Sequence, residues 1–212
     1  MDVNSVINAV SQVKLLPVVV IEDVADAVPL ARALVKGGLP IVEVTFRTAA
    51  AADAIAAIKK DVPDILLGAG TVLTTDQVDA AKAAGATFLV TPGFNPQIVA
   101  HAAKVGLPIV PGINSPTGVE QALSAGLELV KFFPAGPTGG VPFLKALAGP
   151  YGGVRFIPTG GVSAANVGEY LALPSVLACG GSWMVDPKLI AAGKFDEITQ
   201  LTAAAVKAVR AV

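Results

Sequence analysis

A lysine occupies a run of apolar residues in which a core side chain would be expected. Lys131 lies near the end of the run LELVKFFPAG. Alternate side chains of a strand point to the same face, so Lys131 shares its face with Leu129 and Phe133. If that face is buried, loss of water disfavours the ammonium form and leaves a neutral, nucleophilic amine. Lys131 is therefore a candidate nucleophile, and Phe133 is a candidate contact for its substrate.

Three polar residues follow at every second position in another apolar run, IVEVTFRT. Glu43, Thr45 and Arg47 share one face of the strand that this run predicts. A carboxylate on an inner wall can accept a proton from a bound molecule and return it. A guanidinium at the end of the same strand can bind a carboxylate through its fork of donors. We expect Glu43 to act as a general acid and base, and Arg47 to bind substrate.

Lys131 and Glu43 also have explanations that involve no chemistry. The lysine could point outward and extend between helices, or it could balance an internal carboxylate. The two residues could form an ion pair without a catalytic role. A buried pair of this kind contributes little net stability for its desolvation cost, which favours a functional interpretation.

Two glycine-rich turns, PTGGVS and CGGSW, follow the last two apolar runs. Backbone N–H groups can approach an anion closely at glycine, and phosphate often binds at such turns in α/β barrels. We expect Gly160, Gly161 and Gly181 to bind a phosphate, with a further donor from the hydroxyl of Ser182. Neither motif contains a basic residue, so backbone amides would hold the anion. Each pair of glycines alone could equally be turn structure.

Three further turns, GAGTV, TPGF and PGIN, place Thr71, Pro92 and Asn114 at the ends of other apolar runs. Thr71 could bind a substrate carboxylate beside Arg47, and Pro92 is a further candidate for substrate contact. For Pro92 and Asn114, loop structure is the simpler interpretation. His101 lies among alanines in an expected helix and is expected at the surface.

For these residues to form one site, the fold must bring them together. Along the chain, eight strand-like runs alternate with helical stretches. The runs are PVVVI from Pro17, IVEVTF from Ile41, DILLGAG from Asp64, TFLVTPG from Thr87, PIVPGI from Pro108, LELVKFF from Leu127, VRFIPTGG from Val154 and VLACGGS from Val176. The intervening Ala-, Leu- and Lys-rich stretches have helical spacing. Such alternation gives a closed barrel or an open doubly wound sheet, and eight units favour a (β/α)8 TIM barrel. Its site would lie at the C-terminal ends of the strands.

Residues 1–212 are expected to form a single domain. Residues 3–13 should form an extra N-terminal helix, and residues 196–212 should form the last helix. Several helices should end in a left-handed glycine. These glycines are Gly37, Gly85, Gly106 and Gly126.

The composition narrows the class of ligand. The net charge of −1, from 15 basic and 16 acidic residues, predicts no nucleic-acid partner and no anionic membrane surface. The single cysteine, Cys179, excludes an intramolecular disulfide and is expected to be a small buried hydrophobe. Asp2 precedes any basic residue, which is atypical of a secretory signal, and no apolar run is long enough to span a membrane. We expect a cytoplasmic protein that binds a small molecule.

The chain resembles the class I 2-keto-3-deoxy-6-phosphogluconate (KDPG) aldolases and the related 4-hydroxy-2-oxoglutarate (KHG) aldolases. Seven motifs carry the resemblance along the whole chain, in this order: VVVIED, EVTFRT, GAGTVL, TPGF, VKFFPA, PTGGVS and GGSW. The resemblance implies that Lys131 forms a Schiff base with a 2-keto acid and that Glu43 moves the protons. Pyruvate and glyceraldehyde 3-phosphate would be the products.

The resemblance also assigns the substrate contacts. Arg47 and Thr71 would hold the pyruvyl carboxylate, and Thr159 would face the aldehyde half and influence stereochemistry. Gly160, Gly161 and Ser182 would receive the phosphate. A homotrimer without cofactor or metal is implied. The family commonly carries an acidic residue after KFFPA, where this chain has Gly136 and Pro137, so the preferred sugar acid stays open.

Two other functions compete with an aldolase. A phosphate-binding barrel of another reaction type, such as an isomerase or a synthase similar to thiamin phosphate synthase, could share the glycine turns but would not need Lys131 on an inner face. A non-catalytic barrel subunit is the second alternative. The combination of Lys131, Glu43 and Arg47 favours the aldolase over both.

Overall fold

A computed structural model describes residues 3–210 of the chain. Asp2, which contributed to the expectation about a secretory signal, lies outside the described residues. So do residues 211 and 212, the last two of the predicted C-terminal helix.

All eight apolar runs form strands, and the pairings between them are parallel. The strands are β1 (Leu15–Val19), β2 (Ile41–Thr45), β3 (Leu66–Gly70), β4 (Phe88–Val90), β5 (Ile109–Val110), β6 (Gly112–Ile113), β7 (Leu129–Phe132), β8 (Arg155–Pro158) and β9 (Cys179–Gly181). The fifth run gives two strands because Pro111, which has no N–H group to donate to a ladder, divides it.

The strands form two curled parallel sheets. Six strands lie in the order β5-β4-β3-β2-β1-β9, and three lie in the order β6-β7-β8. Isolated parallel bridges pair Phe156 with Val176 and Thr159 with Gly180, beside β8 and β9. Because the strands are parallel, their C-terminal ends lie on the same side of the fold. The predicted α/β class is confirmed.

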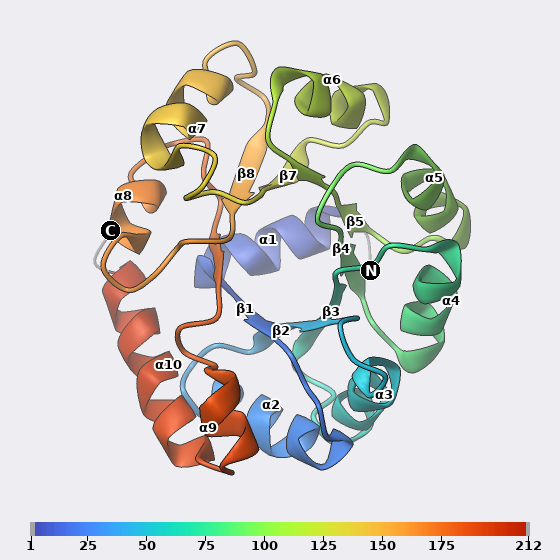
Figure 1. Ribbon diagram of the computed structural model, residues 1–212, viewed down its shortest axis with the longest axis vertical. Helices are drawn as coiled ribbons and strands as arrows, with labels where there is room; N and C mark the ends of the chain where they lie inside the picture. Colours follow the sequence, from blue (N-terminus) through green and yellow to red (C-terminus); the bar gives the residue numbers. More distant parts are fainter. Residues whose placement is uncertain (1–2, 211–212) are drawn as a thin grey trace.

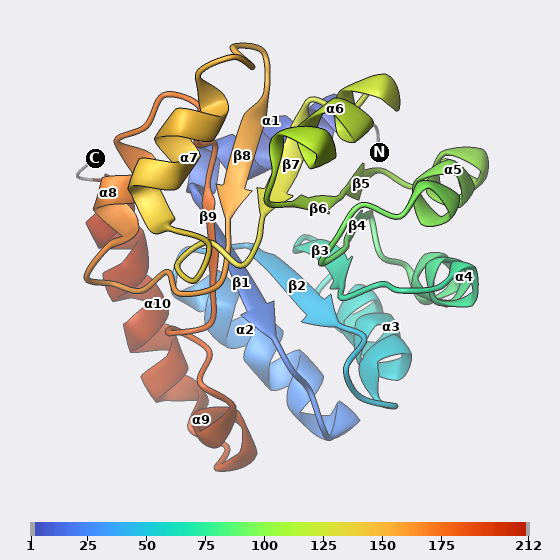
Figure 2. The ribbon, with the colours of Figure 1, turned by 45° about the horizontal axis from the view of Figure 1, so that its top comes forward.

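The helices lie around the strands, with α1 across one end of the ring that the others form (Figure 1 and Figure 2). They are α1 (Val3–Val13), the 3-10 turn η1 (Val24–Asp26), α2 (Ala27–Lys36), α3 (Ala51–Asp61), α4 (Thr75–Ala84), α5 (Pro96–Val105), α6 (Pro116–Ser124), α7 (Gly140–Ala148), α8 (Val167–Leu171), α9 (Pro187–Ala191) and α10 (Phe195–Arg210). Helix α1 lies near the N-terminal ends of β2 and β3, where Ala9 and Val13 line a cavity together with Ile41 and Leu66. None of the helices in residues 3–210 has the length and apolar character needed to cross a membrane.

Local sequence determines where the helices begin and end. Thr74 accepts a hydrogen bond from the Gln77 N–H at the start of α4. Gly85 and Gly106 are left-handed caps, as predicted. The prediction for Gly37 was wrong: this residue has φ −76°, and the left-handed turn falls on Gly38 at φ 84°.

Gly37 instead permits close packing between helices. A Cβ atom at this position would lie 2.6 Å from Cβ of Thr202 on α10. The two glycines after α2 therefore have different roles. Gly37 makes room for α10, and Gly38 turns the chain.

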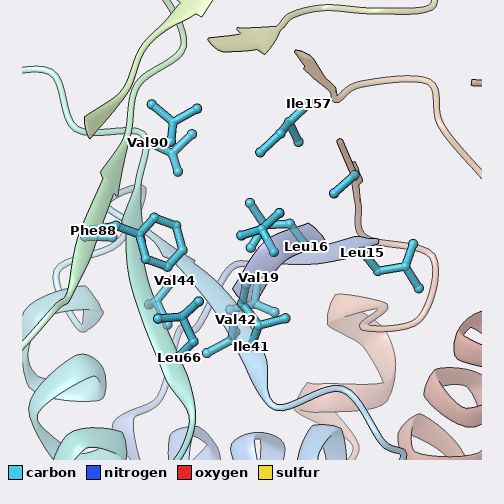
Figure 3. Close-up of a cluster of buried hydrophobic side chains, with 14 of the residues drawn as sticks. Leu15, Leu16, Val19, Ile41, Val42, Val44, Leu66, Phe88, Val90 and Ile157 are labelled. Carbon is cyan, nitrogen blue, oxygen red and sulfur yellow. The ribbon is translucent and has the colours of Figure 1, made fainter. Parts of the chain in front are cut away.

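The strands that carry the polar candidate residues also contribute side chains to the hydrophobic core. Figure 3 shows side chains from β1, β2, β3, β4 and β8 gathered in one cluster, including Leu16, Val42, Leu66, Phe88 and Ile157. Both faces of β2 are buried, because all five of its residues are buried. The core therefore holds the backbone of β2 in place around Glu43.

Substitution of Thr202 by valine should stabilise the fold. The Thr202 side chain is fully buried in α10, and its Oγ1 has no hydrogen-bond partner among residues 3–210. Valine has nearly the same shape and removes the unpaired hydroxyl, so we expect the free energy of unfolding to rise by about 1 kcal/mol in a denaturant titration. Thr199→Val is the control, since its hydroxyl donates to the Ala33 carbonyl at 3.3 Å and the Phe195 carbonyl at 3.0 Å. The prediction fails if both variants lose stability.

Candidate active site

A lysine and a glutamate meet inside the fold. Nζ of Lys131 on β7 donates to Oε1 of Glu43 on β2 at 3.4 Å, and the two side chains are 6% and 0% exposed. Strand β2 belongs to the six-stranded sheet and β7 to the three-stranded one, so these strands are not neighbours. Their side chains therefore meet across the interior, and an outward-pointing Lys131 is excluded.

One oxygen of Glu43 has no partner. Oε2 is buried and makes no hydrogen bond to any described residue. Gly70, at the end of β3, makes room for the carboxylate, because a Cβ atom there would overlap Oε1. Buried polar atoms are nearly always paired, so an unpaired carboxylate oxygen indicates a position where a bound molecule can exchange a proton.

The amine has one charged and one aromatic neighbour. The sequence predicted apolar neighbours and left open an ion pair with Glu43; in the structure the Glu43 carboxylate lies 3.4 Å from Nζ, and the centroid of the Phe133 ring lies 5.2 Å from it. Removal from water disfavours an ammonium, but a nearby carboxylate and an aromatic face favour it. Two groups close to the amine can therefore stabilise its positive charge.

The other two polar residues of the β2 face have separate roles. The Thr45 hydroxyl donates to the Val19 carbonyl of β1 at 2.8 Å, so it is used within the fold. Arg47 lies beyond the end of β2 and is exposed. Its Nε donates to Oγ1 of Thr71 at 3.4 Å. Arg47 and Thr71, separate in sequence, are therefore brought together as predicted.

Thr71 has an unusual backbone. Its φ is 55°, in the left-handed region that a β-branched residue rarely adopts. Such strain persists only where the surrounding structure holds it, and it is concentrated at functional sites. The turn after β3 thus places the hydroxyl of Thr71 beside Arg47 at a cost in backbone energy.

Most of the predicted substrate contacts line one cavity of about 270 Å³. Its walls include Arg47, Phe133, Thr159, Gly160, Gly161, Gly181 and Ser182. The two glycine turns, from the ends of β8 and β9, are therefore side by side. The turns contain no basic residue, but the fold supplies one, since Arg47 reaches the same cavity from β2. An anion bound here would be close to a guanidinium as well as to backbone amides.

The glycine turn after β8 has a defined shape. Gly160 and Gly161 have φ of 88° and 83°, which glycine adopts without strain. The Asn166 side chain supports the turn, because Nδ2 donates to the Gly161 carbonyl at 2.9 Å and Oδ1 accepts from the Ser163 N–H at 2.8 Å. Sequence reasoning missed Asn166. Its position three residues after Ser163 is a recognisable signal for such a turn.

Pro92 lies in a different cavity from the glycine turns. This second cavity, of about 390 Å³, is lined by Pro92, Asn114 and Phe133 among other residues, none of them charged. Phe133 lines both cavities. The sequence suggested that all the turns meet at one site, whereas the structure divides them into two neighbouring spaces on either side of one aromatic ring.

The remaining sequence candidates are outside the site. His101 on α5 contacts Oδ1 of Asp79 at 2.8 Å and is partly exposed. Cys179 is buried, and burial raises the pKa of its thiol to about 12, so it stays protonated at neutral pH. Among residues 3–210, no group of three or more His, Cys, Asp or Glu side chains could hold a metal ion.

A parallel α/β fold with a buried lysine–carboxylate pair, and a glycine-lined cavity at the C-terminal ends of its strands, defines the class of barrel-like enzymes that act on small anionic molecules. Within that class, residues 6–201 match the family described as KDPG and KHG aldolase. The chain belongs to this family, and the resemblance inferred from its motifs is confirmed.

Individual relatives agree with the family. The chain is 56% identical over 198 residues to a 2-dehydro-3-deoxy-phosphogluconate aldolase of Treponema pallidum, which covers 93% of this chain and 94% of the relative. Among solved structures it is similar to the KDPG aldolase of Legionella pneumophila, with pyruvate captured as a covalent carbinolamine intermediate. That comparison has a TM-score of 0.91, 40% identity, and coverage of 93% and 96% of the two chains.

A second structure shows a bound phosphorylated ligand. The 2-keto-3-deoxy-6-phosphogluconate aldolase of Zymomonas mobilis ZM4, solved with 3-phosphoglycerate, has a TM-score of 0.87 and 42% identity, and the match covers 94% of each chain. The first of these two relatives was thus solved with a covalently captured keto acid, and the second with a phosphorylated acid.

Proposed function

We propose that this protein is a class I aldolase that cleaves KDPG into pyruvate and glyceraldehyde 3-phosphate. The observation that carries the proposal is the buried contact between Lys131 and Glu43, with an unpaired oxygen on the carboxylate. Membership of the KDPG and KHG aldolase family and the covalent pyruvate adduct of the Legionella relative support it. Cleavage of 4-hydroxy-2-oxoglutarate to pyruvate and glyoxylate is proposed as a second activity, because the family includes KHG aldolases.

The reaction begins at the amine of Lys131. The nitrogen attacks the C2 ketone, and Glu43 donates the proton with which the carbinolamine hydroxyl leaves as water, which gives an iminium and leaves Glu43 as a carboxylate. Glu43 then takes the proton of the C4 hydroxyl, the C3–C4 bond breaks, and its electrons move into the iminium to form an enamine. The aldehyde leaves, and Glu43 returns its proton to C3. Hydrolysis of the resulting iminium releases pyruvate and restores the lysine.

The substrate contacts follow the arrangement of the cavity. Arg47 and Thr71 bind the pyruvyl carboxylate, since their side chains already contact each other at the end of β2 and β3. Thr159 is buried and lines the same cavity as the glycine turns, and we assign it to the aldehyde half of the substrate. The phosphate binds at Gly160, Gly161, Gly181 and Ser182. Phe133 and Pro92 complete the walls.

Trapping with borohydride tests the proposal. Pyruvate and borohydride should add a reduced pyruvyl group to the protein, and the adduct should map to the peptide that contains Lys131. Pyruvate release from KDPG should persist in excess chelator, since no step uses a metal. A protein that forms no adduct, or forms it at another lysine, would not be this aldolase, and strong loss in chelator would point to a metal-dependent enzyme.

We also propose that the strands form a closed barrel. Residues 1–212 form a single domain in which the two sheets close into a (β/α)8 barrel, with α1 as an extra helix at its N-terminal end. The parallel bridges beside β8 and β9, and the division of one run into β5 and β6, support closure. We further infer a cytoplasmic homotrimer from the resemblance to the family. Light scattering of the purified protein should give three times the mass of the 21.2 kDa chain.

Thr71→Gly should separate stability from activity. Glycine adopts the left-handed conformation without strain, so the free energy of unfolding should rise by up to about 1 kcal/mol. Loss of the hydroxyl beside Arg47 should raise the KM for KDPG by about five- to tenfold. Lys14→Gly is the control, because Lys14 has φ 56° and lies between α1 and β1, away from the site. It should gain stability with unchanged KM, and an unchanged KM in both variants would remove Thr71 from the site.

A further inference from the structure

Phe133 connects the parts of the site. Its ring centroid is 5.2 Å from Nζ of Lys131. The ring also packs on the glycine turn after β8, since a Cβ atom at Gly160 would lie 3.2 Å from its Cε2 atom. The same side chain lines the cavity with the glycine turns and the uncharged cavity beside it. One aromatic ring therefore contacts the amine and the glycine turn and lines both cavities.

We propose that Phe133 is a positioning residue for Lys131, whose ring face holds the side-chain nitrogen and stabilises positive charge on it, both as the ammonium and as the iminium. This inference rests on the proposed aldolase function. It differs from a general contact with substrate, because the ring acts on the charge of the lysine nitrogen rather than on the keto acid.

The charges around Nζ support this role. Glu43 on β2 is the carboxylate that contacts the amine, at 3.4 Å, and Arg47 is the charged residue that lines the cavity next to the ring. A cation within about 6 Å of a ring centroid is attracted to the aromatic face, and the attraction is strongest where water is excluded. Lys131 is 5% exposed, so water provides little of the solvation that an iminium would need. Phe133 provides that stabilisation in addition to Glu43.

Fluorination of the ring tests the charge directly. Phenylalanines with one, two and three ring fluorines have nearly the shape of phenylalanine, but their faces attract cations progressively less. With these residues at position 133, the pH midpoint for formation of the borohydride-trapped pyruvate adduct should fall stepwise, by about half to one pH unit in total. Above that midpoint, where the free amine is neutral, the pyruvate concentration for half-maximal trapping should rise roughly tenfold along the series.

Phe132 is the matched control. It is the adjacent residue, is fully buried, and stacks on Phe143 of α7 with ring centroids 5.9 Å apart. The same fluorinated residues at position 132 should leave the pH midpoint and the pyruvate dependence unchanged. Phe133→Leu, which lacks an aromatic face, should lie at or beyond the end of the position-133 series.

The outcomes separate this inference from the proposed function. If the wild-type protein forms no pyruvate adduct, the aldolase proposal itself is wrong. If the wild-type protein forms the adduct at Lys131 but the fluorinated residues at position 133 behave like phenylalanine, only the role of Phe133 is wrong. A loss confined to Phe133→Leu would show that the side chain serves packing alone.

Discussion

Lys131→Met is expected to reduce KDPG cleavage by roughly 10⁴-fold or more and to abolish the trapped pyruvate adduct. Methionine fills a similar volume on β7 but has no amine, so neither carbinolamine nor iminium can form. No described lysine other than Lys131 contacts Glu43. Steady-state pyruvate release and the mass of the borohydride-treated protein measure the two effects.

The loss must be distinguished from misfolding. Without Lys131, neither oxygen of Glu43 has a partner in the described part of the chain, and removal of one member of a buried pair costs about 3–5 kcal/mol. The double variant Lys131→Met, Glu43→Gln removes the unbalanced charge and should recover part of that stability without any activity. Lys145→Met, at an exposed position of α7, should cleave and trap normally. Substantial cleavage by the folded double variant would contradict the Schiff-base mechanism.

The strands could be predicted because each is a short apolar run between turn residues. Strands buried on both faces, such as β2, give this signal most strongly. The detail at Gly37 could not be predicted, because its cause is distant in sequence. A helix C-terminus followed by two glycines is compatible with a left-handed residue at either one, and contact with Thr202, 165 positions further along, decides between them.

The parts of the site that lie on a single strand could be predicted from the sequence. The two-residue period grouped Lys131 with apolar residues on one face of its strand, and it grouped Glu43 with Arg47. The structure shows that Lys131 points inward and meets Glu43 across the interior. The period did not separate Thr45 from the site, because its bond to the Val19 carbonyl depends on the register between β1 and β2.

Each cavity is lined by several loops that are distant from one another in sequence. A residue pattern within one strand or loop therefore does not predict which residues share a cavity. Pro92 and Gly160 both follow strands, yet they line different spaces because the ring of Phe133 stands between them. The presence of Arg47 beside the glycine turns has the same origin, since that residue reaches the cavity from a strand far away in sequence. An anion bound in this cavity would therefore lie near a guanidinium as well as near backbone amides.

Glu43→Gln should slow KDPG cleavage by about 10²–10⁴-fold while pyruvate can still be trapped on Lys131. Glutamine has the shape of glutamate, and its amide oxygen can accept the hydrogen bond that Nζ gives to Oε1. It cannot take a proton from the C4 hydroxyl or return one to C3. Cleavage, which needs both transfers, is therefore affected more than formation of the iminium.

Thr45→Val is the matched control for Glu43→Gln, since Thr45 lies two residues further along the same face of β2 and is also fully buried. Its hydroxyl is bound to the Val19 carbonyl, so the variant should lose about 1 kcal/mol of stability and keep its cleavage rate within a few-fold. The rate of pyruvate release and the rate of borohydride trapping, measured side by side, separate proton transfer from nucleophilic attack. Equal losses in both rates for Glu43→Gln would mean that the carboxylate acts no later than formation of the iminium, because the transfers at the C4 hydroxyl and at C3 change cleavage alone.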